Sequence, residues 1–148
     1  MRWPPALFLL LLGPAACAGD GTGLDENGNP IGTPPPGDSV TLSGDVQPIF
    51  TANCAFAGCH AGSSPAVGQN LSAGQIYGSI VGVASQQVPG LLRVHPFLPD
   101  SSYLVHKIQG TQGSVGGSGG QMPLGGAPLT AAQIATIRAW ITAGALDN

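Results

Sequence analysis

Two cysteines and a histidine form the most chemically distinctive cluster of the chain, Cys54-Ala55-Phe56-Ala57-Gly58-Cys59-His60. Two neighbouring thiols can add across the two vinyl groups of a haem. A histidine directly after the second thiol is then delivered to the iron. The sequence therefore predicts one covalently attached haem, with Cys54 and Cys59 as attachment sites and His60 as an iron ligand.

The spacing of the two cysteines departs from the common attachment motif, in which two residues separate them. Four residues lie between Cys54 and Cys59 here. This longer spacing is a minority variant, since the two extra residues can bulge outward while Cys59 stays next to His60. A motif of lower specificity requires independent support from elsewhere in the chain.

Met122 supplies that support. Apart from the initiator it is the only methionine, and it lies in the glycine-rich segment 110–128, directly before Pro123. A thioether is a soft ligand for haem iron, and a Met/His axial pair raises the reduction potential. Pro123 restricts Met122 to extended backbone, and the flanking glycines allow a close approach to a flat ring. We expect Met122 to be the distal ligand.

Other roles for these residues stay open. His106 is the rival distal ligand, because a helical histidine would give bis-histidine haem of lower potential. Cys54 and Cys59 could instead form a structural disulfide, which would leave the adjacent imidazole unexplained. A zinc site would need Cys54, Cys59 and His60 at cramped spacing, with His95 or His106 as its fourth ligand.

The elements that must position these side chains are helices. Apolar residues recur at helical spacing and nowhere alternate as in a strand, which predicts an all-α domain with long loops. Pro48 suits only the first turn of its helix, and Asp100 or Ser101 is the expected cap of the third. The four helices are expected over about residues 45–53, 72–81, 100–108 and 130–144.

Two Ser/Thr-x-x-Gln patterns predict capping boxes. One is formed by Ser72 and Gln75, and the other by Thr130 and Gln133. Gly144 suits the left-handed residue that ends the last helix.

Composition divides the chain into three parts. Arg2, a short apolar run and the small residues of 14–18 predict a signal peptide over residues 1–17. The run is far shorter than the roughly 20 residues of a membrane-spanning helix. Residues 18–39 lack apolar periodicity and predict a disordered linker, followed by one domain over 40–148. Cys17 is the expected lipidation site, with soluble secretion after the Ala16-Cys17-Ala18 pattern as the alternative.

Charge and motif content exclude several classes of function. The chain has 4 basic and 7 acidic residues, so no basic patch exists to bind nucleic acid. Loss of residues 1–17 would remove Arg2 and leave a net charge of −4, which favours a basic or neutral partner. Gly116–Gly120 lacks the lysine and the strand of a nucleotide-binding loop. No catalytic constellation is evident, so an enzyme is not expected.

The order of these features resembles class I cytochrome c: helix, cysteines and histidine, long loop, short helices, Met-Pro loop and capped final helix. The segments 47–50 and 137–145 are similar to cytochrome c modules of bacterial exported proteins. The resemblance covers about residues 43–146. It implies a small helical fold around one haem c, thioether bonds at Cys54 and Cys59, and axial ligation by His60 and Met122. It also implies that the first and last helices cross near a haem edge.

The expected function is that of a monohaem c-type cytochrome that carries single electrons between exported redox proteins. It would face the periplasm and meet a membrane only through a lipid on Cys17. Two alternatives stay open. One is a haem-based ligand-binding or sensing module, if the loop that carries Met122 is loose enough to release iron. The other is a haem-free lipoprotein domain held by a Cys54–Cys59 disulfide.

Overall fold

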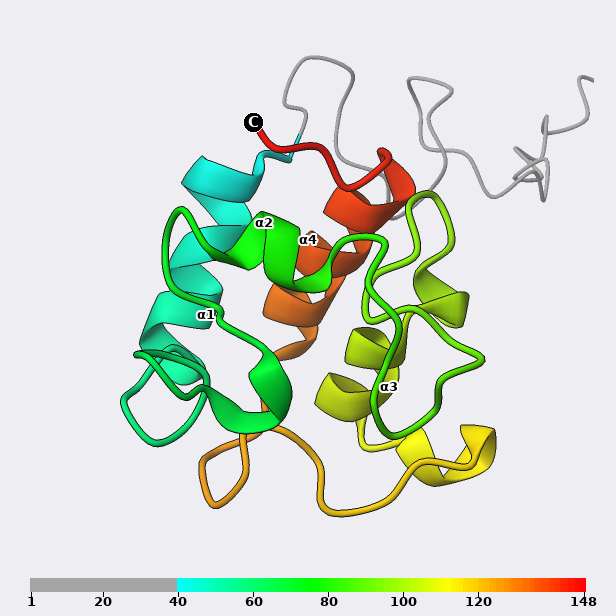
Figure 1. Ribbon diagram of the computed structural model, residues 1–148. Helices are drawn as coiled ribbons and strands as arrows, with labels where there is room; N and C mark the ends of the chain where they lie inside the picture. Colours follow the sequence, from blue (N-terminus) through cyan, green and yellow to red (C-terminus); the bar gives the residue numbers. More distant parts are fainter. Residues whose placement is uncertain (1–39) are drawn as a thin grey trace, which may run out of the picture. The chain divides into compact units, whose positions relative to one another are not determined.

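The computed structural model describes residues 40–148, and this part of the chain is helical without a β-strand. The predicted all-α class is thus confirmed. The expected signal peptide, the linker and Cys17 lie outside the described residues. Within 40–148, no helix is long and apolar enough to cross a membrane. Residues 40–148 contain four α-helices (Figure 1), namely α1 (Gln47–Asn53), α2 (Ile76–Ile80), α3 (Tyr103–Gln109) and α4 (Ala131–Thr142).

The first helix begins with a π-helical turn, η1 (Leu42–Val46), that runs directly into α1. The Thr41 hydroxyl accepts a hydrogen bond from the Gly44 amide at 3.1 Å and so caps this turn. Pro48 lies in the first turn of α1, as predicted. Phe50, on the inner face of α1, is fully buried.

The second helix is shorter than predicted, and its expected capping box is absent. The helix starts at Ile76, and its cap residue, Gln75, makes no capping bond through its side chain. The Gln75 side chain instead donates to the carbonyl of Gly74 at 3.3 Å. Gly74 has φ +73°, a left-handed conformation that interrupts helical geometry between Ser72 and Ile76. The prediction that Ser72 and Gln75 form a capping box was wrong for this reason.

The third helix also starts later than predicted. Residues Pro99–Ser101 form a separate 3-10 turn, η3, and Ser102 rather than Asp100 or Ser101 precedes α3. The Ser102 hydroxyl is fully buried and donates to the carbonyl of Leu98 at 3.0 Å. Ser102 is therefore the N-cap residue of α3 by position, but its side chain links to the preceding loop instead of capping the helix.

The fourth helix agrees with its predicted start. The Thr130 hydroxyl accepts from the Gln133 amide at 3.2 Å, and the Gln133 side chain accepts from the Thr130 amide at 2.9 Å. Both halves of the capping box are thus present. After the helix, Gly144 has φ +106°, which matches its predicted role in ending it.

The core forms where α4 meets the N-terminal helix. Ile137, Trp140 and Ile141 on one face of α4 are fully buried, and they belong to the same apolar cluster as Phe50. The chain ends beside the start of the described part, because the Ser43 amide donates to the Asn148 carbonyl at 2.8 Å (Figure 1).

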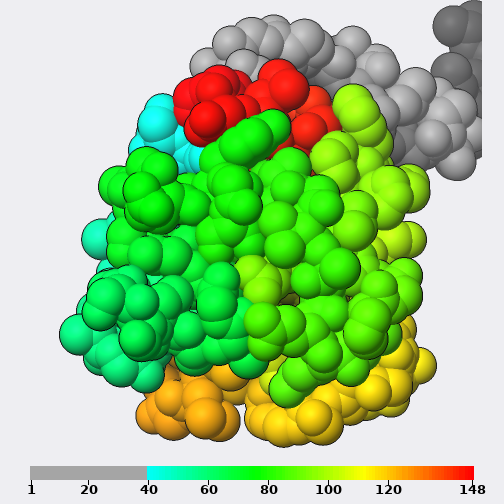
Figure 2. All heavy atoms as spheres, viewed as in Figure 1, coloured from blue at the N-terminus to red at the C-terminus, as the bar shows by residue number. Residues whose placement is uncertain are grey.

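Long loops cover much of the helical core. Figure 2 shows the chain between about residues 60 and 95 (green) spread over one face of the molecule, with the 110–128 loop (yellow to orange) along its lower edge. Two further 3-10 turns, η2 (Ala66–Gly68) and η4 (Gln112–Val115), lie in these two loops.

Candidate cofactor site

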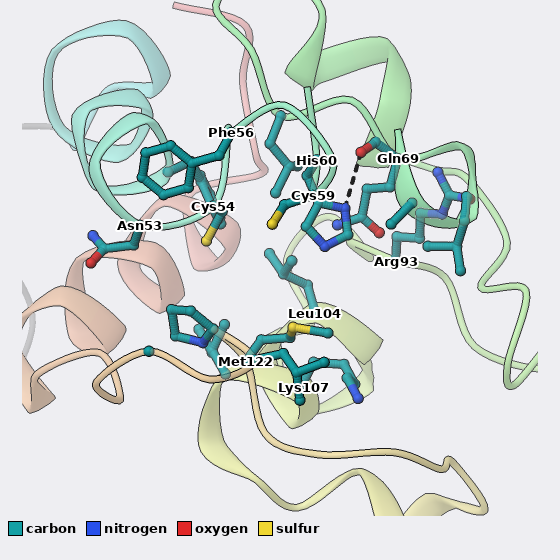
Figure 3. Close-up of a pocket in the computed structure, with 18 of the residues that line it drawn as sticks. Asn53, Cys54, Phe56, Cys59, His60, Gln69, Arg93, Leu104, Lys107 and Met122 are labelled. Atoms are coloured by element: carbon teal, nitrogen blue, oxygen red, sulfur yellow. Dashed lines mark hydrogen bonds between the residues drawn. The ribbon is translucent and has the colours of Figure 1, made fainter. Parts of the chain in front are cut away.

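A cavity with a volume of about 490 Å³ in the described part of the chain is lined by Cys54, Cys59, His60 and Met122, among other residues. These four side chains are the ones that the sequence singled out. Figure 3 shows His60 and Met122 reaching into the cavity from opposite sides, with the cysteine sulfurs beside His60. The fold therefore brings two distant segments of the sequence together at one site.

The cysteine segment leaves the end of α1 as a tight loop. The Cys54 amide donates to the Phe50 carbonyl at 2.8 Å, and the Cys54 carbonyl accepts from the His60 amide at 3.2 Å. Gly58, with φ +83°, provides the left-handed turn that closes the loop. The two residues added relative to the common motif are thus accommodated in this loop.

The two thiols differ in exposure. Both cysteines are free, and Cys54 is buried while Cys59 is exposed. Burial, and then the proximity of Cys59, raise the pKa of the Cys54 thiol to about 11. Cys54 therefore stays protonated at neutral pH and is a weak nucleophile in the folded chain without cofactor.

The orientation of His60 leaves one ring nitrogen directed at the cavity. Its Nδ1 lies 3.2 Å from the carbonyl oxygen of Gln69 (Figure 3). A carbonyl can only accept, so this hydrogen bond places a proton on Nδ1, and in a neutral ring the lone pair is then on Nε2. Histidines that bind metals are commonly held by such a hydrogen bond on the second nitrogen. His60 thus presents Nε2 to the cavity while the backbone holds Nδ1.

Met122 enters the cavity from the loop that follows α3. Its amide donates to the Lys107 carbonyl at 2.9 Å. The Gln121 side chain donates to the Ile108 carbonyl at 2.8 Å, and the Gln112 side chain donates to the Gly119 carbonyl at 2.7 Å. This glycine-rich loop is therefore fixed to α3 and η4 by several hydrogen bonds, despite its composition.

The cavity wall is largely apolar and carries two cations. The apolar side chains come from α1, α3 and the covering loops, and they include Phe50, Leu71, Leu104, Ile108 and Leu124. The cations are Arg93 and Lys107, and no acidic side chain belongs to the lining among residues 40–148. Such a cavity suits an apolar ligand that carries negative charge.

Arg93 was not predicted as a site residue. It is 6% exposed, and burial lowers the pKa of its guanidinium group. Its Nη1 donates to the carbonyls of Ser79 at 2.7 Å and Gly68 at 3.2 Å, and its Nη2 donates to that of Val67 at 2.7 Å. The sequence feature that could have pointed to Arg93 is a single charge within the apolar run Leu91-Leu92-Arg93-Val94, in a chain with only 7% charged residues.

The other histidines lie away from the cavity. His106 faces the opposite direction on α3, where its Nε2 donates to the Asp100 carbonyl at 3.1 Å and its Nδ1 lies 2.9 Å from the Thr111 hydroxyl. His95 donates from Nδ1 to the Pro96 carbonyl at 3.0 Å. Between residues 40 and 148, no three His, Cys, Asp or Glu side chains are arranged to hold a metal ion, so the zinc alternative gains no support.

Comparison of the chain with known protein families, with curated proteins and with solved structures found no match.

Proposed function

We propose that this protein is a monohaem c-type cytochrome that carries single electrons. The observation that carries the proposal is the convergence of two thiols, an imidazole and a thioether on one apolar cavity, although Met122 lies far from His60 in the sequence. The donor set matches the chemistry of a covalently attached haem with His/Met axial ligation.

The residues around the cavity fit a haem in three respects. Its volume of about 490 Å³ lies within the roughly 300–1,000 Å³ of cofactor pockets. The apolar wall matches a porphyrin face. Arg93 offers a buried positive charge on the other side of His60 from the cysteine sulfurs in Figure 3, where haem carboxylates could be neutralised.

Each residue would have a distinct role. Cys54 and Cys59 would anchor the cofactor, and His60 and Met122 would fill its two axial positions. Bound haem would supply reversible one-electron exchange at its iron. The apolar wall formed by Phe50, Leu71, Leu104 and Ile108 would limit the access of water to the iron.

The proposal extends to cellular context. The signal-like residues 1–17 support export, and Cys17 supports a lipid anchor followed by the linker 18–39. Electron donors and acceptors would then be exported redox proteins facing the periplasm. Membrane association would depend on the lipid alone.

The direct test is expression in a host with haem-ligating machinery, followed by mass spectrometry and a haem stain on a denaturing gel. We expect the mature mass to include one haem that survives denaturation, and the Cys54→Ser, Cys59→Ser double variant to lose it. A colourless wild-type protein with Cys54 bonded to Cys59 would refute the proposal in favour of the haem-free alternative.

The ligand-binding alternative needs a loose Met122 loop. The hydrogen bonds from Gln112, Gln121 and Lys107 instead hold this loop in place. The electron carrier is therefore the function that the geometry favours.

A further inference from the structure

One side chain on the last turn of α3 holds the Met122 loop at several points. Lys107 Nζ donates to the Gly120 carbonyl at 2.7 Å and to the Ser118 carbonyl at 3.1 Å. The Lys107 carbonyl accepts from the Met122 amide at 2.9 Å. Lys107 thus contacts the loop just before Met122 through its side chain and at Met122 through its backbone.

These contacts add to the hydrogen bonds that Gln112 and Gln121 make in ordering a glycine-rich loop. Glycines carry no side chains to pack, and ordering them costs more conformational entropy than ordering other residues. Hydrogen bonds from an ammonium group are stronger than those between neutral groups.

The surroundings of Lys107 in the cavity wall are consistent with a role in ordering the loop. Lys107 lines the cavity together with Met122 (Figure 3), and no acidic side chain bonds its ammonium group within residues 40–148. Its polar partners are the two loop carbonyls. The charge of Lys107 is therefore used to fix the loop, and no ion pair competes for it in the described part of the chain.

We propose that Lys107 is a positioning residue that keeps the Met122 thioether in the cavity. It thereby determines whether methionine or an external small ligand occupies the distal side of the iron. This inference rests on the proposed function, because the distal role of Met122 is part of it. Lys107 acts through the loop and does not itself serve as an iron ligand.

The test compares three variants of the full chain. Lys107→Leu keeps an apolar side chain, removes the ammonium group and adds no new iron ligand, whereas Lys107→Arg keeps the charge and the donors. Arg138→Met is the control, since Arg138 pairs with Asp100 at 2.8 Å and its side chain forms no hydrogen bond with the 110–128 loop. The readouts are amide hydrogen exchange of residues 116–122 and of α4, the near-infrared band of methionine-ligated ferric haem, and carbon monoxide binding to the reduced protein.

In Lys107→Leu we expect the loop amides to exchange on the order of tenfold faster, with α4 unchanged, because charge-assisted hydrogen bonds are lost only at the loop. The near-infrared band should weaken, and carbon monoxide should bind faster. Lys107→Arg should retain most of the near-infrared band and most of the resistance to carbon monoxide binding. Arg138→Met should behave as wild type.

Two results would overturn the inference. One is a Lys107→Leu protein with wild-type loop exchange and an unchanged band. The other is equal loosening of the loop and α4, which would make Lys107 a general stabiliser of the fold. The exchange readout does not require haem. A colourless wild-type protein would refute the proposed function, while loosening confined to the loop would still support the positioning role.

Discussion

At the scale of single residues, the candidate site combines groups of unequal reactivity. His60 has one nitrogen fixed by the Gln69 carbonyl and the other free for a metal. Cys59 is exposed, whereas Cys54 is buried, and burial raises the pKa of the Cys54 thiol to about 11. Met122 lies across the cavity from His60. Replacing Met122 is the test that distinguishes an electron carrier with methionine-ligated iron from other haem proteins.

Replacing Met122 tests the distal position. We expect Met122→His to retain covalent haem, to lose the near-infrared band and to lower the reduction potential by on the order of 0.1 V, because imidazole favours ferric iron relative to a thioether. Spectroelectrochemistry measures both properties. His106→Gln is the control and should keep the wild-type potential, because His106 lies away from the cavity. A Met122 variant with an unchanged potential would remove Met122 from the ligand set.

The thiols give a second prediction, for the haem-free chain. Iodoacetamide should modify exposed Cys59 well before Cys54, because the thiolate is the nucleophile and the Cys54 pKa is raised. Peptide mass spectrometry during the reaction gives the order. Equal modification rates at the two cysteines in the folded chain would contradict the burial and the raised pKa of Cys54. Unfolding in urea is the control and should make the two rates equal.

The same pKa shift predicts how stability depends on pH. Folding raises the Cys54 pKa from 9.0 to about 11, so the folded chain holds this proton more tightly than the unfolded chain. The associated stability is present below pH 9 and is lost as the pH rises toward 11. Urea unfolding of the haem-free protein across this range should show the loss, and Cys54→Ala should show a smaller one. Identical pH dependence in both proteins would contradict the shift.

At the scale of elements, local hydrogen bonds decide which predicted helices form as expected. The capping box of Thr130 and Gln133 lies next to residues with strong helical periodicity, and it is present in the structure. The similar pattern at Ser72 and Gln75 does not form one, because Gly74 between them adopts a left-handed conformation. A capping pattern is thus informative only where the intervening residues can be helical.

The α4 cap can be tested by mutation. Thr130→Ala should lower the free energy of unfolding by about 1 kcal/mol, since the amide of Gln133 loses its acceptor. Urea denaturation followed by circular dichroism measures this change. Thr136→Ala is the control within the same helix, because its hydroxyl bonds only the Ala132 carbonyl, and it should be neutral or slightly stabilising. Similar losses in both variants would argue against a specific capping effect.

At the scale of the whole molecule, charge is distributed unevenly along the chain. Four of the 7 acidic residues precede residue 40. The part from 40 to 148 balances three acidic with three basic residues, namely Asp45, Asp100, Asp147, Arg93, Lys107 and Arg138. The net negative charge inferred from the full chain therefore does not belong to the domain that contains the cavity.

This balance predicts weak electrostatic steering of redox partners. Electron exchange of the isolated 40–148 domain with anionic and cationic inorganic reagents should change by less than about threefold between low and high salt, because steering scales with the charges of both partners. Stopped-flow kinetics measures these rates, and the full chain is the comparison. A steep and opposite salt dependence for the two reagents would contradict the prediction.

The sequence by itself determined the features that depend on near neighbours. Helical periodicity gave the all-α class, and the Thr130 and Gln133 pattern gave the start of α4, since both arise from contacts within a few residues. The types and spacing of Cys54, Cys59 and His60 were likewise enough to predict a haem site there, and that prediction awaits its test.

Only the tertiary structure decided which distant residues meet. It placed Met122 in the cavity and turned His106 away from it, although both lie near α3 in sequence. It also brought buried Arg93 to the cavity from a loop that carries no motif. Such juxtapositions arise from the packing of loops on the helical core, where no short-range pattern records which partner a side chain will find.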